Sequence, residues 1–209
     1  MLKLANKLII AGASGHGKVV ADIAIKMNKW QNITFLDDDE NIKSSMGLEV
    51  IGKISDAFLF RDEADFFVAV GNNSTRELIQ EDFTNKGLNI VTLVHPNAII
   101  GSEVEIGSGT VVMAGVVINS SAKIGKGCIL NTGCNIDHDN EIDNYVHISP
   151  GVNLAGSVKV GEKTWIGMGS NIINNVSITS NCTIGAGSLI VKDICTPGKY
   201  YGSPAKKKD

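Results

Sequence analysis

The sequence predicts two domains: a small doubly wound parallel sheet of the α/β class, followed by a parallel β-helix of hexapeptide repeats. Two observations support this division. Strand-like and helix-like segments alternate through the first part of the chain, and an apolar residue then recurs at every sixth position. We expect the α/β domain at residues 1–93, the β-helix at residues 94–194, and an irregular C-terminal cap and tail at residues 195–209.

The first domain shows the alternation of a parallel sheet. Short apolar strands are expected at residues 7–12, 33–36, 65–70 and 90–94, and helices at residues 19–27 and 74–85. Ser74 and Glu77 have the spacing of a capping box at the start of the second helix.

The repeat begins near Val94 and continues to Ile190, with only Ile, Leu or Val at each sixth position. Four places later the residue is mostly small or β-branched, with Asn140 as an exception. Glycine often stands one place after the apolar residue, as expected at corners that need positive φ or close approach. Three hexads make one triangular coil, so residues three hexads apart in the sequence should stack about 4.8 Å above one another.

A glycine-rich loop, GASGHG at residues 12–17, separates the first strand from the first helix. Its backbone amides and the helix N-terminus favour a phosphate. The dinucleotide pattern would require glycine where Ser14 stands, so a nucleotide diphosphate-sugar fits better than NAD, although a tight turn without ligand is the plainer interpretation. Asp37, Asp38 and Gly71 follow other strands and should line the same crevice, but aspartates are also common in turns.

Two histidines fall within the repeat, where polar side chains must point outward. His138 lies between Asp137 and Asp139, an arrangement suited to a general base. Gly156 follows three hexads later and should lie one coil above the imidazole, leaving open space. His147 is half a coil away, so a site shared by both histidines would need a neighbouring subunit.

A further column on an adjacent face contains Met168 and Ala186, which are also three hexads apart. Exposed backbone amides along it could hold an extended pantetheine arm.

Composition excludes several classes. The formal charge of −3 and pI near 5.8 argue against nucleic-acid binding and against binding to anionic membranes. No apolar stretch is long enough for membrane insertion and no cleavable leader is evident, so a cytoplasmic protein is expected. The four cysteines lack CxxC spacing and are interpreted as reduced core residues.

Several segments together resemble one family: GASGHGK, FLDDD, AVGNN, the hexads, IDHDNEIDNYVHISPG, AGSVKVG and the closing GSPAK. They are similar to the sugar O- and N-acyltransferases that join a nucleotide-sugar domain to a left-handed β-helix, notably bacterial enzymes acting on UDP-linked 4-amino-4,6-dideoxy sugars. The resemblance implies acetyl-CoA as acetyl donor, no metal, and a homotrimer with active sites at subunit interfaces.

The resemblance also implies roles for individual residues. His138 would be the base in a direct attack on the thioester, with Asp139 as its acidic partner; relatives can carry Glu after the base, which leaves open whether Asp137 or Asp139 orients the ring. The implied acetyl-CoA positions are His147, Gly156, Met168 and Ala186. The implied nucleotide-sugar positions are Ser14, Gly15, His16, Asp37, Asp38 and Gly71.

Three alternatives remain open at this stage. O-acetylation of a sialic acid or related sugar would use the same two domains and histidine. A zinc hydratase of the carbonic anhydrase type would need three convergent histidines, whereas only His138 and His147 are well placed. A non-catalytic scaffold that binds nucleotide sugars would neither bind nor consume acetyl-CoA.

Overall fold

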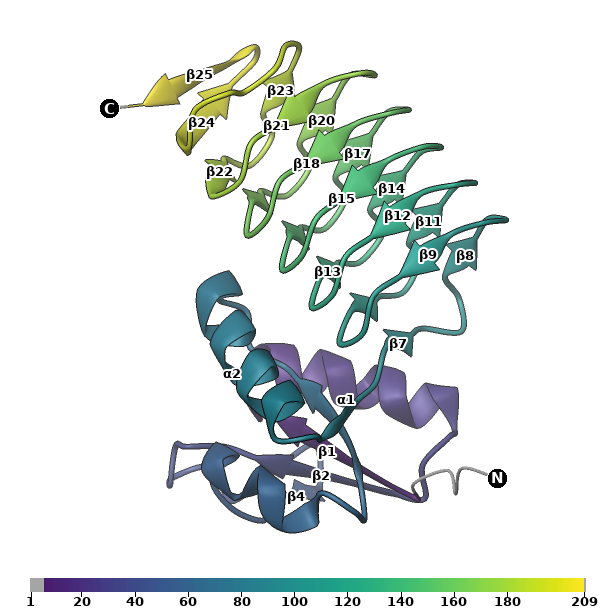
Figure 1. Ribbon diagram of the computed structural model, residues 1–209, viewed down its shortest axis with the longest axis vertical. Helices are drawn as coiled ribbons and strands as arrows, with labels where there is room; N and C mark the ends of the chain where they lie inside the picture. The colour runs from purple at the N-terminus through teal and green to yellow at the C-terminus, as the bar shows by residue number, and fades with distance from the viewer. Residues whose placement is uncertain (1–5, 209) are drawn as a thin grey trace. The chain divides into compact units, whose positions relative to one another are not determined.

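The computed structural model describes residues 6–208, and the chain divides after Pro96 into two compact units. The first unit contains a four-stranded parallel sheet in the order β2-β1-β5-β6 (Figure 1). Its strands are β1 (Lys7–Ala11), β2 (Asn32–Leu36), β5 (Asp65–Val68) and β6 (Asn89–Ile90). The predicted parallel sheet is confirmed.

Two helices and several short elements complete this unit. Helix α1 (Gly15–Met27) contacts β1 and β2, and α2 (Asn73–Asn85) contacts β5 and β6. The short elements are β3 (Ser44–Ser45), β4 (Leu48–Glu49), the 3₁₀ helix η1 (Ile54–Phe60) and β7 (Leu93–Val94).

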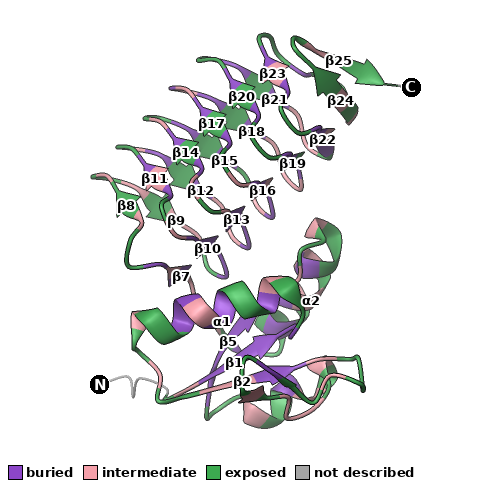
Figure 2. Cartoon of the chain, turned by 180° about the vertical axis from the view of Figure 1, so that it is seen from behind, coloured by how far each residue is buried: buried purple, intermediate pink, exposed green. Residues whose placement is uncertain are grey.

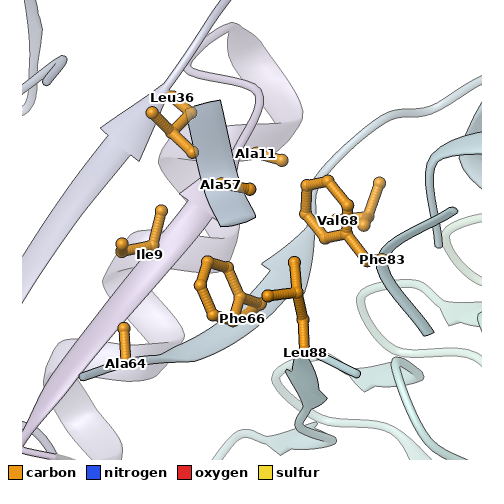
Figure 3. Packing of buried hydrophobic residues seen from close by; sticks show 9 residues of the cluster. All are labelled: Ile9, Ala11, Leu36, Ala57, Ala64, Phe66, Val68, Phe83 and Leu88. Carbon is orange, nitrogen blue, oxygen red and sulfur yellow. The ribbon is translucent and has the colours of Figure 1, made fainter. Parts of the chain in front are cut away.

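Apolar side chains from the sheet and from α2 form the core of the first unit. Phe66 of β5 and Phe83 of α2 meet edge to face, with ring centroids 5.9 Å apart. Ile9 and Leu36 from the neighbouring strands belong to the same buried cluster (Figure 3). This packing fixes the strand ends from which the loops at residues 12–17 and 71–73 emerge.

Three details of the first unit differ from the sequence prediction. Helix α2 begins at Asn73 and is capped by Asn72, whose side chain accepts a hydrogen bond from the Thr75 N–H at 3.0 Å, so the predicted Ser74 capping box is wrong. Helix α1 begins at Gly15, earlier than residue 19. The single strand predicted at residues 90–94 is two short strands, because the chain leaves the extended pairing between Ile90 and Leu93.

Gly17 lets α1 start directly against the end of β1. A Cβ added at Gly17 would lie 2.0 Å from the carbonyl oxygen of Gly12, which is rigid backbone. A Cβ added at Gly15 would meet no atom within 4 Å. The two glycines of one loop therefore differ sharply in what they tolerate.

We expect Gly17→Ala to lower the free energy of unfolding by about 3 kcal/mol, because either the helix or the loop must move. Gly15→Ala is the matched control and should change stability by less than about 1 kcal/mol, since alanine is favoured over glycine in a helix. Denaturant unfolding of both variants measures the difference. Equal stability of Gly17→Ala and the wild-type protein would contradict the close approach.

The second unit is a left-handed parallel β-helix, as predicted (Figure 1). Its first face contains β8 (Ile99–Ile100), β11 (Val117–Ile118), β14 (Asn135–Ile136), β17 (Asn153–Leu154), β20 (Asn171–Ile172) and β23 (Leu189–Ile190). The second contains β9 (Glu105–Ile106), β12 (Lys123–Ile124), β15 (Glu141–Ile142), β18 (Lys159–Val160) and β21 (Ser177–Ile178). The third contains β10 (Val111–Val112), β13 (Ile129–Leu130), β16 (His147–Ile148), β19 (Trp165–Ile166) and β22 (Cys182–Ile184).

The coils stack in the predicted register of three hexads. Asn135 pairs with Asn153, and Ile136 with Leu154, in parallel strands. From Val112 to Ile190 every sixth residue is buried, and buried segments recur along the coils (Figure 2). The hexad period thus forms a continuous apolar column through the unit.

The prediction of an irregular cap is wrong, and the prediction that the cysteines lie in the core is wrong for one of the four. Residues 198–208 do not form an irregular cap but an antiparallel hairpin of β24 (Gly198–Gly202) and β25 (Ala205–Lys208), with β24 extending the third face beside β22. The cysteines also differ among themselves: Cys128, Cys134 and Cys182 are buried, whereas Cys195 is exposed.

Of the two reasons predicted for the corner glycines, positive φ and close approach, the structure shows the second. Those one place after the apolar residue do not have positive φ. They are needed for close approach, since a Cβ at Gly125 would lie 2.7 Å from the backbone of the next coil. Positive φ falls two places later, where the residues include Asp139, Ser157 and several glycines.

No helix within residues 6–208 is long and apolar enough to cross a membrane.

Candidate active site

His138 lies in the turn between β14 and β15, with its side chain exposed to solvent. Its Nδ1 is 2.7 Å from Oδ2 of Asp139. Asp139 lies at a corner of the coil and has a φ of 57°, in the left-handed region of backbone conformation. A carboxylate can only accept a hydrogen bond, so Nδ1 carries the proton and the neutral ring keeps its lone pair on Nε2. The exposed nitrogen is therefore the one able to accept a proton.

Gly156 provides the room for this imidazole. A Cβ added at Gly156 would lie 2.6 Å from both Cε1 and Nε2 of His138. The predicted stacking of the two residues one coil apart is therefore seen in the structure. The ring itself occupies the space that the missing side chain leaves.

The structure distinguishes the two neighbouring aspartates. Asp139 bonds to the ring, whereas Oδ1 of Asp137 accepts hydrogen bonds from the His138 backbone N–H and from Nδ2 of Asn119, both at 2.8 Å. These two bonds hold the pKa of the Asp137 carboxyl below its usual range. Asp139 therefore orients the ring, and Asp137 fixes the backbone that carries it.

The pKa of His138 is raised above its ordinary value of 6.5, first by the hydrogen bond to Asp139 and then by the charge of Asp137. Both carboxylates stabilise the imidazolium form. A base in this position would be stronger than free histidine, and it would lose activity as falling pH protonates it.

A groove of about 520 Å³ runs along the first face beside this turn. Asp137 lines one part of it. Its floor is a ladder in which Asn135 donates to Asn153 at 2.8 Å and Asn153 donates to Asn171 at 2.9 Å. The turn that carries His138 thus borders a groove that contains both this asparagine ladder and apolar side chains.

His147 lies on the third face, and its ring is half-buried. It stacks on Trp165, with ring centroids 5.8 Å apart and an interplanar angle of 11°. Its Nε2 lies 3.2 Å from Nδ2 of Asn131. Sequence reasoning missed Asn131 and Trp165; the offset of three hexads between His147 and Trp165 would have revealed the stacking.

Met168 and Ala186 lie at one corner of the coil, and the Met168 side chain is exposed. The next residues in this corner, Gly151, Gly169 and Gly187, have positive φ, and a Cβ added at any of them would meet nothing within 4 Å. The backbone along this corner is accessible to an extended ligand.

In the first unit, Ser14 and Gly15 are exposed at the N-terminus of α1, and Ser14 makes no side-chain capping bond. Asp37 reaches this loop: its Oδ2 accepts a hydrogen bond from the Ala13 N–H at 2.7 Å. Asp38 instead accepts from the Ile54 N–H at 3.0 Å. Both aspartates therefore hold backbone in place, and each keeps acceptor capacity for a ligand.

His16 is half-buried, and its Nε2 is shielded from solvent. Burial, and then the positive charge of Arg76, lower its pKa to about 4, so the imidazole is neutral near pH 7. Within residues 6–208 no group hydrogen-bonds its buried Nε2.

Sequence reasoning missed Arg76 of α2, which is fully buried. Its guanidinium donates to the carbonyl oxygens of Val70 at 3.0 Å and Gly71 at 3.2 Å, and to the side chain of Asn73 at 2.8 Å. Arg76 thereby fixes the loop that contains Gly71. Helix α2 gave no signal for this, because an arginine among polar helix residues is usually solvated.

Residues 6–208 bring together no group of three or more His, Cys, Asp or Glu side chains that could hold a metal ion.

Two family models match the chain, the PglD N-terminal domain at residues 7–83 and the bacterial transferase hexapeptide (six repeats) at residues 157–192. A curated relative, UDP-N-acetylbacillosamine N-acetyltransferase from Bacillus subtilis (strain 168), is 35% identical over 118 residues, which are 52% of each protein. The aligned part of the chain thus spans about half the length of this curated relative.

Solved structures match over nearly the whole chain. The acetyltransferase domain of PglB from Neisseria gonorrhoeae FA1090 in complex with acetyl coenzyme A is 38% identical, with a TM-score of 0.94 over 97% of this chain and 99% of that one. A perosamine N-acetyltransferase from Caulobacter crescentus in complex with CoA and GDP-perosamine is 32% identical, with a TM-score of 0.93 over 97% of both chains. The chain belongs to the hexapeptide-repeat sugar acyltransferases, the family predicted from its motifs.

Proposed function

We propose that the protein transfers an acetyl group from acetyl-CoA to the amino group of a nucleotide-linked amino sugar of the 4-amino-4,6-dideoxy type. The observation that carries this proposal is the His138–Asp139 pair, with the ring placed in the space beside Gly156. Two of the three relatives named above are N-acetyltransferases and the third is an acetyltransferase domain. Two of the three hold acetyl-CoA, or CoA with a nucleotide sugar. These names favour acetylation of an amine over O-acetylation of a sialic acid.

In the proposed reaction, Nε2 of neutral His138 takes a proton from the sugar amine while the amine nitrogen attacks the thioester carbonyl. A C–N bond forms, the C–S bond then breaks, and the proton passes to the departing thiolate of CoA. Asp139 keeps the ring in the required tautomer and stabilises the imidazolium. No acyl-enzyme is needed, and Cys134, whose pKa burial raises to about 12, is a poor nucleophile.

The first unit would hold the nucleotide. The N–H groups at the start of α1, beside Ser14 and Gly15, would bind phosphate. The remaining acceptors of Asp37 and Asp38, the neutral imidazole of His16 and the loop at Gly71 would contact the base, ribose or sugar.

Acetyl-CoA would lie along the corner of Met168 and Ala186, near Gly156, with His147 close to the thioester. His138 and His147 belong to different sides of the coil, so we propose a homotrimer in which neighbouring subunits complete each active site. We also propose a cytoplasmic location, where both substrates are available.

The test is an assay of thiol release from acetyl-CoA with UDP- and GDP-linked 4-amino sugars and with free sialic acid. The proposal predicts release with a nucleotide-linked amino sugar only. Release with sialic acid alone would favour O-acetylation, and failure to bind acetyl-CoA would favour a scaffold.

We expect Asp139→Asn to lower kcat by about tenfold and to move the acidic limb of kcat/KM to lower pH. The amide removes the main interaction that raises the pKa of His138, so the ring stays neutral further into the acid range. Asp137→Asn is the control and should cause a smaller shift in the same direction, because Asp137 is the second cause. An unchanged acidic limb in Asp139→Asn would contradict the assignment of the base.

A further inference from the structure

Asn140 is a buried polar residue at the end of the turn that carries His138. Its Nδ2 donates to the carbonyl oxygen of Asp137 at 2.8 Å and to that of Ala155, in the next coil, at 2.9 Å. The side chain therefore ties the residue before His138 to the residue before Gly156. These are the two backbone segments that set the position of the ring.

The turns that lead from the third face to the first are closed by a backbone hydrogen bond. The backbone N–H of Cys134 donates to the carbonyl of Asn131 at 3.1 Å, and that of Ser170 to Gly167 at 3.3 Å, in each case three residues back. Within residues 6–208 no backbone bond of this kind joins Asn140 to Asp137. The stacked turns at residues 119–122, 155–158 and 173–176 also lack it. The side-chain bond from Asn140 to the Asp137 carbonyl is therefore an additional closure of the His138 turn.

The link between coils has counterparts elsewhere. Thr110 donates through Oγ1 to the carbonyl of Gly125 at 2.8 Å, and Ser170 to that of Gly185 at 3.0 Å, in each case a carbonyl of the next coil. Asn140 makes the same link to Ala155. What distinguishes Asn140 from Thr110 and Ser170 is the second bond, made to the carbonyl oxygen of Asp137 in its own turn.

Packing alone does not favour an amide here. The residues stacked in the same column are Ala122, Val158 and Val176, all buried. Oδ1 of Asn140 is buried, and within residues 6–208 nothing donates a hydrogen bond to it. A buried acceptor without a donor is destabilising, so valine at this position would be expected to give a core at least as stable as asparagine does.

We propose that Asn140 is a positioning residue for the reaction, which holds the turn of Asp137, His138 and Asp139 in a fixed position relative to Gly156. This inference rests on the proposed function. A small displacement of a catalytic base costs turnover more than binding. The contribution of Asn140 should therefore appear in kcat and in the state of the His138 ring, and not in stability.

The test compares Asn140→Val with Thr110→Val. Both remove a buried donor to a carbonyl of the next coil, but only the first also frees Asp137. For Asn140→Val we expect kcat to fall about tenfold to a hundredfold, with KM for both substrates little changed and with a melting temperature equal to or above that of the wild-type protein. Thr110→Val should keep wild-type kcat. Wild-type kcat in Asn140→Val, or an equal loss in Thr110→Val, would overturn the proposal.

Two additions keep the test decisive. If Asn140→Val does not fold, Asn140→Thr replaces it in the test, because threonine retains a donor for Ala155, as Thr110 does for Gly125. For Asn140→Thr a kcat below wild-type is still expected, and wild-type kcat would overturn the proposal.

If the wild-type protein shows no turnover with any acceptor, the proposed function fails. NMR titration of His138 then decides on Asn140: a shifted pKa in Asn140→Val supports the positioning role, and an unchanged titration overturns it.

Discussion

Replacing His138 with alanine is expected to lower kcat by about 10²–10⁴-fold, the range that general base catalysis supplies. The side chain is exposed, and its ring bonds to Asp139, which is next to it in the sequence. The free energy of unfolding should therefore change by less than about 0.5 kcal/mol. Thiol release from acetyl-CoA measures turnover, and denaturant unfolding measures stability.

Added imidazole provides the control for this variant. It should restore part of the turnover of His138→Ala, because Gly156 leaves an open space that the lost ring had filled. It should have no effect on the wild-type protein. Turnover close to wild-type in His138→Ala without imidazole would remove His138 from the mechanism.

Gly156→Ala is expected to have the second-largest effect, a loss of about 100-fold in kcat. The new methyl group would lie 2.6 Å from Nε2 of His138, so the ring must turn away from its present place. An exposed ring can move at little cost, so the variant should fold normally. Turnover and melting temperature, measured on the same preparation, separate the two effects.

A double-mutant cycle shows whether Gly156 acts through the ring. In the background of His138→Ala, the further change Gly156→Ala should lower kcat by much less than about 100-fold, because the group that it displaces is already missing. Independent, additive losses would mean that Gly156 matters in another way, for example through direct contact with acetyl-CoA.

The β-helix could be predicted because its period leaves few alternatives. An apolar residue at every sixth position from Val94 to Ile190 sets the coil, and the coil places Gly156 above His138 without any structural knowledge. The motif GASGHG likewise identified the loop at the start of α1. In both cases a local pattern determines which backbone atoms meet.

The features that the sequence did not reveal depend on where side chains point and on which of several nearby hydrogen-bond partners they select. Asn140 was visible only as an exception in a column of small residues, and its bonds to Asp137 and Ala155 follow from coordinates. Arg76 gave no signal. Its position in the helix sequence is equally compatible with a solvated guanidinium and with the buried one, bonded to carbonyl oxygens, that the structure shows. The choice between Asp137 and Asp139 likewise required the hydrogen bonds of the ring.

The most direct measurement is a structure of the protein with CoA and a nucleotide-linked 4-amino sugar bound. The account predicts that the sugar amine lies about 2.6–3.2 Å from Nε2 of His138, or one bridging water away, with the CoA sulfur on the far side of the amine. An amine beyond the reach of this ring, or a coenzyme bound where His138 cannot approach its thioester, would contradict the account.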